Sequence, residues 1–132
     1  MEHRLRAALL AWLRADPALA NALNAIEEEN PSRATAPWLG IAASASTDWS
    51  MKDRRGREVR LALELQTRGD DPAGDAALIN AIERRIVALP GQHSDFHCVT
   101  VQFLRARAER RSDNRRAALI ECRFRLLEIS TE

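Results

Sequence analysis

The chain has 132 residues, of which 45% are hydrophobic and 30% are charged, with a formal net charge of +1. This length fits one domain, residues 1–132, around one hydrophobic core, and the apolar share excludes an intrinsically disordered chain. The small net charge argues against a general nucleic-acid-binding protein, which normally carries a clear basic excess.

Neither the cysteines nor the apolar runs indicate a secreted or membrane protein. Cys98 and Cys122 lie inside apparent strands and form no spaced disulfide framework. The first apolar run, AALLAWL, is short, is interrupted by Arg14, and indicates a helix face rather than a signal peptide. No stretch reaches the roughly 20 apolar residues of a membrane span. We therefore expect a protein that makes no membrane contact and is found in the cytoplasm where it is made.

The N-terminal residues predict an amphipathic helix. Its apolar stripe recurs at three- and four-residue spacing and consists of Leu5, Leu9, Trp12 and Leu13. Asp16 and Pro17 then have the pattern of an N-cap and a first helical residue, which predicts a short second turn. The polar stretch EEENPSRATAP follows and indicates a connection.

Two strands are predicted next. Residues 38–46 form an extended segment of small side chains. The following strand alternates strictly, with Val59, Leu61, Leu63 and Leu65 on one face and Glu58, Arg60, Glu64 and Gln66 on the other. One face is therefore covered, while the other is wet or meets another subunit. This pattern is typical of an antiparallel sheet with helices on a single side.

The second half of the chain predicts a helix and two more strands. Asp75 is placed to cap the helix DAALINAIERRIVAL, which carries an apolar stripe and ends at Pro90-Gly91. The stripe consists of Leu78, Ile82, Ile86 and Leu89, with Ile79 beside it. The apolar faces of the two strands consist of Val99, Val101 and Phe103, and of Ile120, Cys122, Phe124 and Leu126.

These elements predict an α+β fold in the order α-β-β-α-β-β. The economical architecture is a four-stranded, mainly antiparallel sheet with two helices on one face. The order of the strands in the sheet cannot be read from the pattern.

The sequence shows no catalytic or metal-binding constellation. His93 and His97 have the spacing of helical metal ligands, with Cys98 adjacent, but they follow Pro90-Gly91, where the chain leaves a helix. No Ser or Cys nucleophile has a companion His, and no glycine-rich phosphate loop is present. We therefore expect no enzyme, no metal site and no cofactor.

Two charged connections are the candidate binding sites. The stretch between the first two strands, residues 47–57, is long for a hairpin, and its candidate docking residues are Asp48, Trp49, Lys52, Arg54, Arg55 and Arg57. Trp49 is either an anchor for a partner or a side chain folded over the edge of the core. The second hairpin adds Arg105 and Arg107, and its tip carries Arg110, Arg111, Arg115 and Arg116. These cations could face DNA phosphates, pair with acidic residues of a neighbouring subunit, or be solvated.

Taken in order, several segments resemble one known family. They are RAALLAWLRADPAL, APWLGI, DWSMKDRRG, VRLALEL, the helix ending in LPG, VTVQFLRARAERR and ALIECRFRLLE. Together they resemble the small tail-completion or tail-terminator proteins of long-tailed phages and gene transfer agents, over nearly the whole chain. The pair Arg54-Arg55 and the stretch NRRAAL depart from the family pattern.

The resemblance implies a structural role in a particle. It implies a hexameric ring at the head-proximal end of the tail tube that ends tube assembly and joins the tail to the head. The implied partners are further copies of the chain, the major tail tube protein and a neck or head-closure protein, with DNA passing through the lumen and no sequence-specific nucleic acid. The implied location is the bacterial cytoplasm during assembly and then the particle. A neck or head-closure connector and a nucleic-acid-binding module that uses the hairpin-tip arginines are the alternatives.

Overall fold

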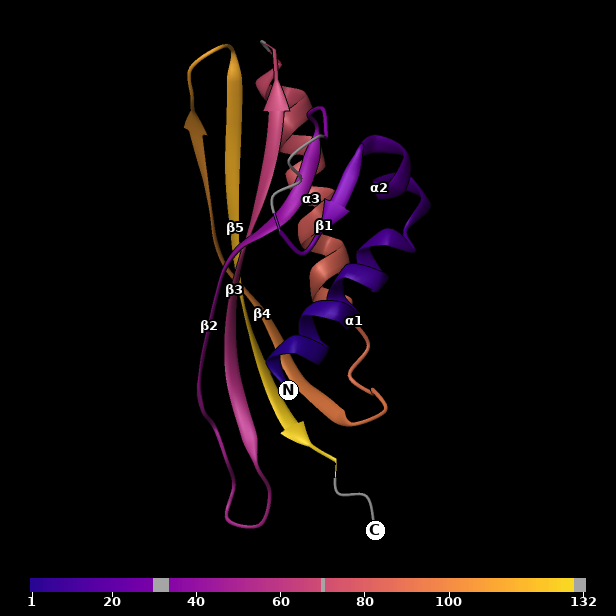
Figure 1. Ribbon diagram of the computed structural model, residues 1–132, viewed down its shortest axis with the longest axis vertical. Coiled ribbons are helices and arrows are strands. Elements are labelled where there is room, and N and C mark those ends of the chain that lie inside the picture. The colour runs from indigo at the N-terminus through magenta and orange to yellow at the C-terminus, as the bar shows by residue number, and fades with distance from the viewer. Residues whose placement is uncertain (30–33, 70, 130–132) are drawn as a thin grey trace.

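One five-stranded sheet with helices on one side organises the computed structural model, which describes residues 1–29, 34–69 and 71–129 (Figure 1). The elements are α1 (Glu2–Arg14), α2 (Pro17–Ala22), β1 (Ala25–Glu27), β2 (Trp38–Asp48), β3 (Gly56–Arg68), α3 (Pro72–Val87), β4 (Phe96–Arg110) and β5 (Arg115–Glu128). Residues 30–33 of the predicted polar connection lie outside the described residues.

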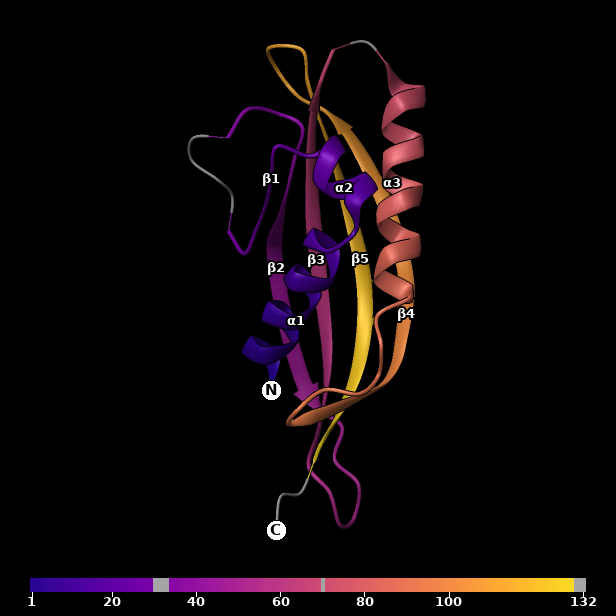
Figure 2. The ribbon, with the colours of Figure 1, turned by 90° about the vertical axis from the view of Figure 1, so that its right-hand side faces the viewer.

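The strands lie in the order β1-β2-β3-β5-β4. β1 pairs parallel to β2, and the four long strands pair antiparallel. Figure 2 shows α1 crossing in front of β2 and β3, while α3 runs beside β5 and β4. The predicted α+β class and the one-sided helical layer are confirmed. The predicted counts were too low, because the six-residue α2 and the three-residue β1 are too short to show a period.

The core lies between the helices and the covered face of the sheet. The predicted alternation of β3 and β5 is confirmed, since the fully or almost fully buried side chains include Val59, Leu61, Leu63, Leu65, Ile120, Cys122, Phe124 and Leu126. Complete burial of one such aliphatic or aromatic side chain contributes about 1.5–3 kcal/mol. The apolar faces of β3 and β5 therefore form the sheet side of the core, against which the helices pack.

Reciprocal contacts between Trp12 and Arg85 hold α1 against α3. Trp12 is half-buried, and its Nε1 donates to the Arg85 carbonyl oxygen at 2.6 Å. Arg85 Nε donates back to the Trp12 carbonyl oxygen at 2.9 Å, and its guanidinium carbon lies 3.3 Å from the centre of the indole ring. Trp12 thus belongs to the predicted stripe, but it acts at the seam between the two helices.

Two predictions about single positions were wrong. Asp71 caps α3, because its Oδ1 accepts from Gly74 N at 3.1 Å and Pro72 takes the first helical position; Asp75 lies one turn inside. A β-bulge between Cys98 and Thr100 turns Val99 outward, so Val99 is 40% exposed.

The polar face of β3 is only partly exposed to solvent. Glu64 and Gln66 are 6% and 8% exposed, although they lie on the face without helices. Gln66 Nε2 donates to Glu64 at 3.1 Å, and Arg111 reaches the same carboxylate at 3.4 Å. Long side chains of the neighbouring strands therefore cover this end of the open face.

Asp75 instead joins α3 to the end of the sheet. Its Oδ2 accepts from Arg116 Nε at 2.6 Å and from the Thr67 hydroxyl at 3.0 Å. The bond from Arg116 holds the pKa of Asp75 below its ordinary value. A lowered pKa in the folded state means that this carboxylate stabilises the fold above the unfolded-state pKa, and that the contribution is lost as the pH falls through the folded-state pKa.

Replacing Asp75 by asparagine tests this contact. We expect Asp75→Asn to lower the free energy of unfolding by about 1–2 kcal/mol at about pH 7, because a charged hydrogen bond is lost and Arg116 keeps its charge. The difference from the wild type should shrink below about pH 4, where the unfolded wild-type carboxyl is protonated. Urea unfolding at both pH values measures it. A difference independent of pH would contradict the ionised pair.

Candidate functional site

The connection between β2 and β3 is a narrow hairpin extension rather than the long loop predicted. β2 continues through Asp48 and β3 begins at Gly56, so only residues 49–55 connect them. Met51 N donates to Arg54 O at 2.8 Å and Arg54 N donates back at 3.4 Å. Two bonds of this kind close a two-residue turn, with Lys52 and Asp53 at its tip. The extension projects from one end of the molecule (Figure 1).

Gly56 allows the base of this extension to close. Trp49 N donates to Gly56 O at 3.0 Å, and Gly56 N donates to Ser50 Oγ at 3.0 Å. A Cβ at position 56 would lie 2.8 Å from Leu126 O and closer still to Trp49 O. Only glycine fits where three backbone segments approach this closely.

The predicted anchor, Trp49, is partly covered by its own chain. It is half-buried, and the guanidinium of Arg125 lies 5.5 Å from the centre of its ring, within the range of a cation–π contact. Met51 is the apolar side chain that projects from the turn, with 51% of its surface exposed. Sequence reasoning missed Met51, although an apolar residue inside a charged connection is a signal that could have been used.

The cations of this turn differ in their surroundings. Lys52, Arg54 and Arg55 are exposed, and no carboxylate pairs with them in the described part of the chain. Arg57 instead lies 3.5 Å from Glu2 of α1. A hydrogen bond from the Ser46 hydroxyl is the main cause that lowers the pKa of Glu2 to about 2. Arg57 therefore belongs to the contact between α1 and the sheet more than to the turn.

The second predicted patch, at the tip of the β4–β5 hairpin, is partly neutralised. Asp113 and Asn114 turn the chain with φ of 59° and 60°, the left-handed pair of a type I′ turn. Arg116 is bound by Asp75, and Arg111 lies 3.4 Å from Glu64. Arg110 is exposed, and Arg115 Nε donates to Ser112 O at 3.4 Å.

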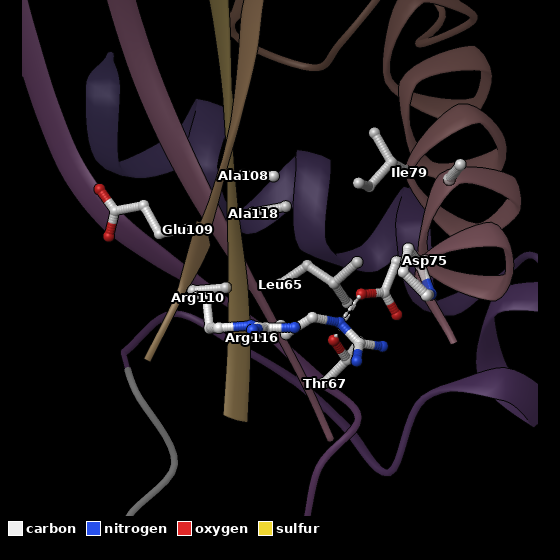
Figure 3. A pocket seen from close by; sticks show the side chains of 12 residues that line it. Leu65, Thr67, Asp75, Ile79, Ala108, Glu109, Arg110, Arg116 and Ala118 are labelled. Atoms are coloured by element: carbon white, nitrogen blue, oxygen red, sulfur yellow. Dashed lines mark hydrogen bonds and ion pairs between the residues drawn. The ribbon is translucent and has the colours of Figure 1, made fainter. Parts of the chain in front are cut away.

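A shallow cavity lies between this hairpin and the start of α3. Its volume is about 260 Å³, and Figure 3 shows Arg116 reaching across it to Asp75 and Thr67. The apolar part of its lining includes Leu65, Ile79, Ala108 and Ala118. Because the cavity is open and Asp75 and Arg116 pair with each other across it, it has the form of a surface contact rather than of an active site.

The two hairpin ends lie at opposite ends of the molecule (Figure 1). The cause is the strand order: β5 is antiparallel to β3, so Arg115 pairs with Arg68 at the end of β3 that is far from Gly56. The predicted cations therefore form two separate patches, and the sheet does not bring them together.

Charge pairs cover the face of the sheet between these ends. Glu58 lies 3.1 Å from Arg125, 3.8 Å from Arg123 and 4.0 Å from Arg60, and Arg105 pairs with Glu121. This face therefore presents both signs in neighbouring rows. Such a surface matches the near-zero net charge and suits contact with protein more than with a polyanion.

The histidine and cysteine residues considered as metal ligands or nucleophiles pack within the fold. The His93 ring stacks on Phe96 at 4.4 Å, and its Nε2 lies 2.7 Å from Pro90 O. Burial raises the pKa of Cys98 to about 11 and that of Cys122 to about 12, which keeps both thiols protonated and unreactive. Within the ranges that the structure describes, no three His, Cys, Asp or Glu side chains gather as metal ligands, and no helix is long and apolar enough to span a membrane.

Comparison with known proteins gives one family and one fold. A family model described as tail completion protein gp17 matches residues 7–128. A chain from the solved virion of a native gene transfer agent particle superposes with a TM-score of 0.81 and 24% sequence identity, over 95% of both chains. No curated protein sequence matches. Because the family model covers almost the entire chain, the protein belongs to the tail completion protein gp17 family.

Proposed function

We propose that the chain is a structural protein of a phage or phage-like particle, and that it forms a ring at the head-proximal end of the tail tube. The ring ends tube assembly and joins the tail to the head, and DNA passes through its centre. The observation that carries the proposal is the family match over residues 7–128, together with the likeness to a chain of a gene transfer agent virion. The role needs no catalysis, and we propose that the chain is not an enzyme.

The shape of the molecule supports a protein that stands between two partners. Its two hairpin turns point away from each other, toward opposite ends of the molecule (Figure 1). One end carries the exposed Met51 among cations that pair with no carboxylate of the described residues, and the other carries arginines that are partly held by carboxylates. We assign the β2–β3 turn to one axial partner, the tail tube or the neck protein, and the β4–β5 turn to the other.

The role predicts a defined defect when the gene is deleted. We expect electron micrographs of the deletion strain to show tail tubes of uncontrolled length and heads without tails, and expression of the wild-type chain to restore joined particles. Joined particles of normal tail length in the absence of the protein would refute the role. Copurification with heads rather than with tails would favour the head-closure alternative.

A charge reversal tests the docking assignment of the β2–β3 turn. Arg55→Glu should leave the melting temperature unchanged, because the side chain is exposed and has no carboxylate partner among the described residues. Joined particles should fall by about tenfold through repulsion at the contact. Arg84→Glu, an equal charge change at an exposed position of α3, is the matched control and should retain joining. Equal loss in both variants would indicate a general charge effect.

A nucleic-acid role makes a different prediction. Binding through the arginines of the β4–β5 turn would give an affinity for DNA that falls steeply with salt concentration. Since Arg111 and Arg116 are engaged by carboxylates of the same chain, we expect weak binding at low salt and none at physiological salt. Fluorescence anisotropy of labelled duplex DNA measures it.

A further inference from the structure

The sheet ends in two strand edges that no strand among the described residues covers. β4 is the last strand on one side, and within the described part of the chain only the bridge between Gln92 and His97 pairs with its outer edge. On the other side, β1 pairs with residues 38–40 of β2, and the outer edge of residues 43–48 has no strand partner among the described residues. Uncovered edges present backbone N–H and C=O groups to which another strand can bind.

The two edges have opposite strand directions. β2, β3, β5 and β4 are antiparallel at each step, so β4 runs opposite to β2. A second copy, rotated about an axis along the strands and placed beside β4, therefore presents its β2 antiparallel to that edge. A contact between two different surfaces of the same chain is the kind that closes into rings.

The pairing registers place the open parts of the two edges at the same level. Residues that pair from strand to strand form rows across the sheet, from β2 through β3 and β5 to β4. The row that begins at Ser46 of β2 ends at Val101 of β4, and the row that begins at Ser44 ends at Phe103. Residues 44–47 of β2 thus stand level with residues 100–103 of β4. The latter form the regular stretch between the two bulges of β4, so both segments are undistorted over the same length.

Backbone N–H and C=O groups of β2 are available for pairing at its outer edge. Trp49 N donates to Gly56 O, so Trp49 turns its backbone groups toward β3. Because N–H groups alternate in direction along an antiparallel strand, the even-numbered residues Ser44 and Ser46 turn theirs outward. Side chains at these two positions lie on the helix side, opposite Leu61 and Val59.

The backbone N–H and C=O groups of β4 point outward at the residues that stand level with Ser44 and Ser46. Arg111 N donates to Arg115 O, so the odd-numbered residues of β5 bond to β4 and the even-numbered ones bond to β3. Val101 and Phe103 pair with even-numbered residues of β5 and therefore turn their N–H and C=O groups outward. Val101 would then face Ser46, and Phe103 would face Ser44, in closely spaced hydrogen-bonded pairs on the same side of the sheet.

The side chains at the two edges are complementary in size. The β2 segment reads AASAST, all small, and it lacks the Lys or Pro that normally protects an exposed edge. The β4 edge carries larger apolar groups, with Val99 40% exposed and Val101 and Phe103 half-buried. Pairing would cover these side chains at little steric cost.

Charge is also complementary. Glu27 of β1 and Arg107 of β4 lie at the two ends of one row of paired residues, so they meet between copies where β4 of the next copy passes outside β1. In the single chain, Glu27 pairs with Arg14 and Arg107 with Glu109, and all four side chains are exposed by 40% or more. Exposed pairs of this kind contribute little and exchange readily.

We infer that residues 44–47 of one copy pair antiparallel with residues 100–103 of the next, so that the sheets join edge to edge around the ring. The inference rests on the proposed ring and specifies how its subunits meet. It places every β2–β3 turn on one rim and every β4–β5 turn on the other. The occupant of each edge is a second copy of this chain.

A disulfide trap tests this pairing. The row that begins at Ala45 ends at Gln102, and both residues lie on the face without helices. They would form a non-hydrogen-bonded pair with Cα atoms about 4.5 Å apart, a separation that a disulfide spans. Within one copy they stand three strand spacings apart, about 14 Å, so only neighbouring copies can be linked.

We expect particles built with the double variant Ala45→Cys/Gln102→Cys to give, on mild oxidation, a reducible ladder of linked multimers of the chain in denaturing gels. Ala45→Cys/Val101→Cys is the matched control and should give no ladder, because Val101 lies on the helix side. Tail ends that carry the ring in micrographs but give no ladder would overturn edge pairing and leave the ring standing. Tail ends without the protein would overturn both proposals.

A backbone variant gives a second readout that needs no added cysteine. Ser46→Pro removes an outward N–H without removing a bond to β3, so the isolated chain should keep its fold. Rings at tail ends should then fall by at least about tenfold. Ser46→Ala loses the same hydroxyl but keeps the N–H, and it should assemble like the wild type. Equal assembly of the two variants would overturn the inference.

Discussion

Gly56→Ala is expected to lower the free energy of unfolding by about 3 kcal/mol, at the upper end of the cost of overpacking. The added Cβ would lie 2.8 Å from Leu126 O and closer still to Trp49 O. Both are backbone atoms of neighbouring segments, so relief requires the strands themselves to move apart. Urea unfolding followed by circular dichroism measures the loss.

The neighbouring Arg55→Ala is the control for that measurement. Its side chain is exposed, whereas the backbone carbonyl of Arg55, which accepts from Glu128 N at 2.9 Å, is kept in the variant. The change in stability should therefore stay within about 0.5 kcal/mol. A Gly56→Ala protein as stable as Arg55→Ala would mean that the base of the turn is open, and the description of a closed extension would be wrong.

Trp12→Ala is expected to cost about 3 kcal/mol, at the low end for Trp-to-Ala changes because the side chain is half-buried. The substitution removes the indole that packs at the seam between α1 and α3 and the donor to Arg85 O. It also removes the ring beneath the Arg85 guanidinium. Thermal and urea unfolding of the purified variant measure the change.

Two further variants separate the contribution of the indole hydrogen bond from that of the contact between the Trp12 and Arg85 side chains. Trp12→Phe keeps an aromatic ring and loses the N–H, so its cost should be about 1 kcal/mol, the value of one hydrogen bond. Combining Trp12→Ala with Arg85→Leu should cost less than the sum of the single changes, because the two side chains share one contact. Strict additivity would show that each side chain packs independently.

The period-two pattern of apolar residues correctly predicted the core positions of β3 and β5, because alternate side chains of a strand point to the same face of the sheet. The rows Val59 to Leu65 and Ile120 to Leu126 each show a clean period of two, and both face the helices. The same logic failed at Val99, where a bulge inserts one residue and shifts the alternation. No local pattern reveals a bulge, since the partner strand decides which residue is extra.

The binding residues were predicted by type but not by surroundings. Trp49, Arg57, Arg111 and Arg116 all lie in charged connections, as the sequence indicates, yet each is engaged by a residue distant in the chain. Such partners are selected by strand order and by the placement of α1 and α3. The cations that stay exposed at the β2–β3 turn, Lys52, Arg54 and Arg55, form no ion pair with a carboxylate among the described residues.

By itself, the sequence determined the α+β class, the two covered strands, the one-sided helical layer and the cationic character of both hairpin turns, because each depends on local spacing. Only the tertiary structure decided that β5 lies beside β3, that the two turns therefore point to opposite ends, and that β2 and β4 form the open edges. Those features depend on which strands pair, and pairing is selected by the packing of the whole sheet against its helices rather than by any one segment.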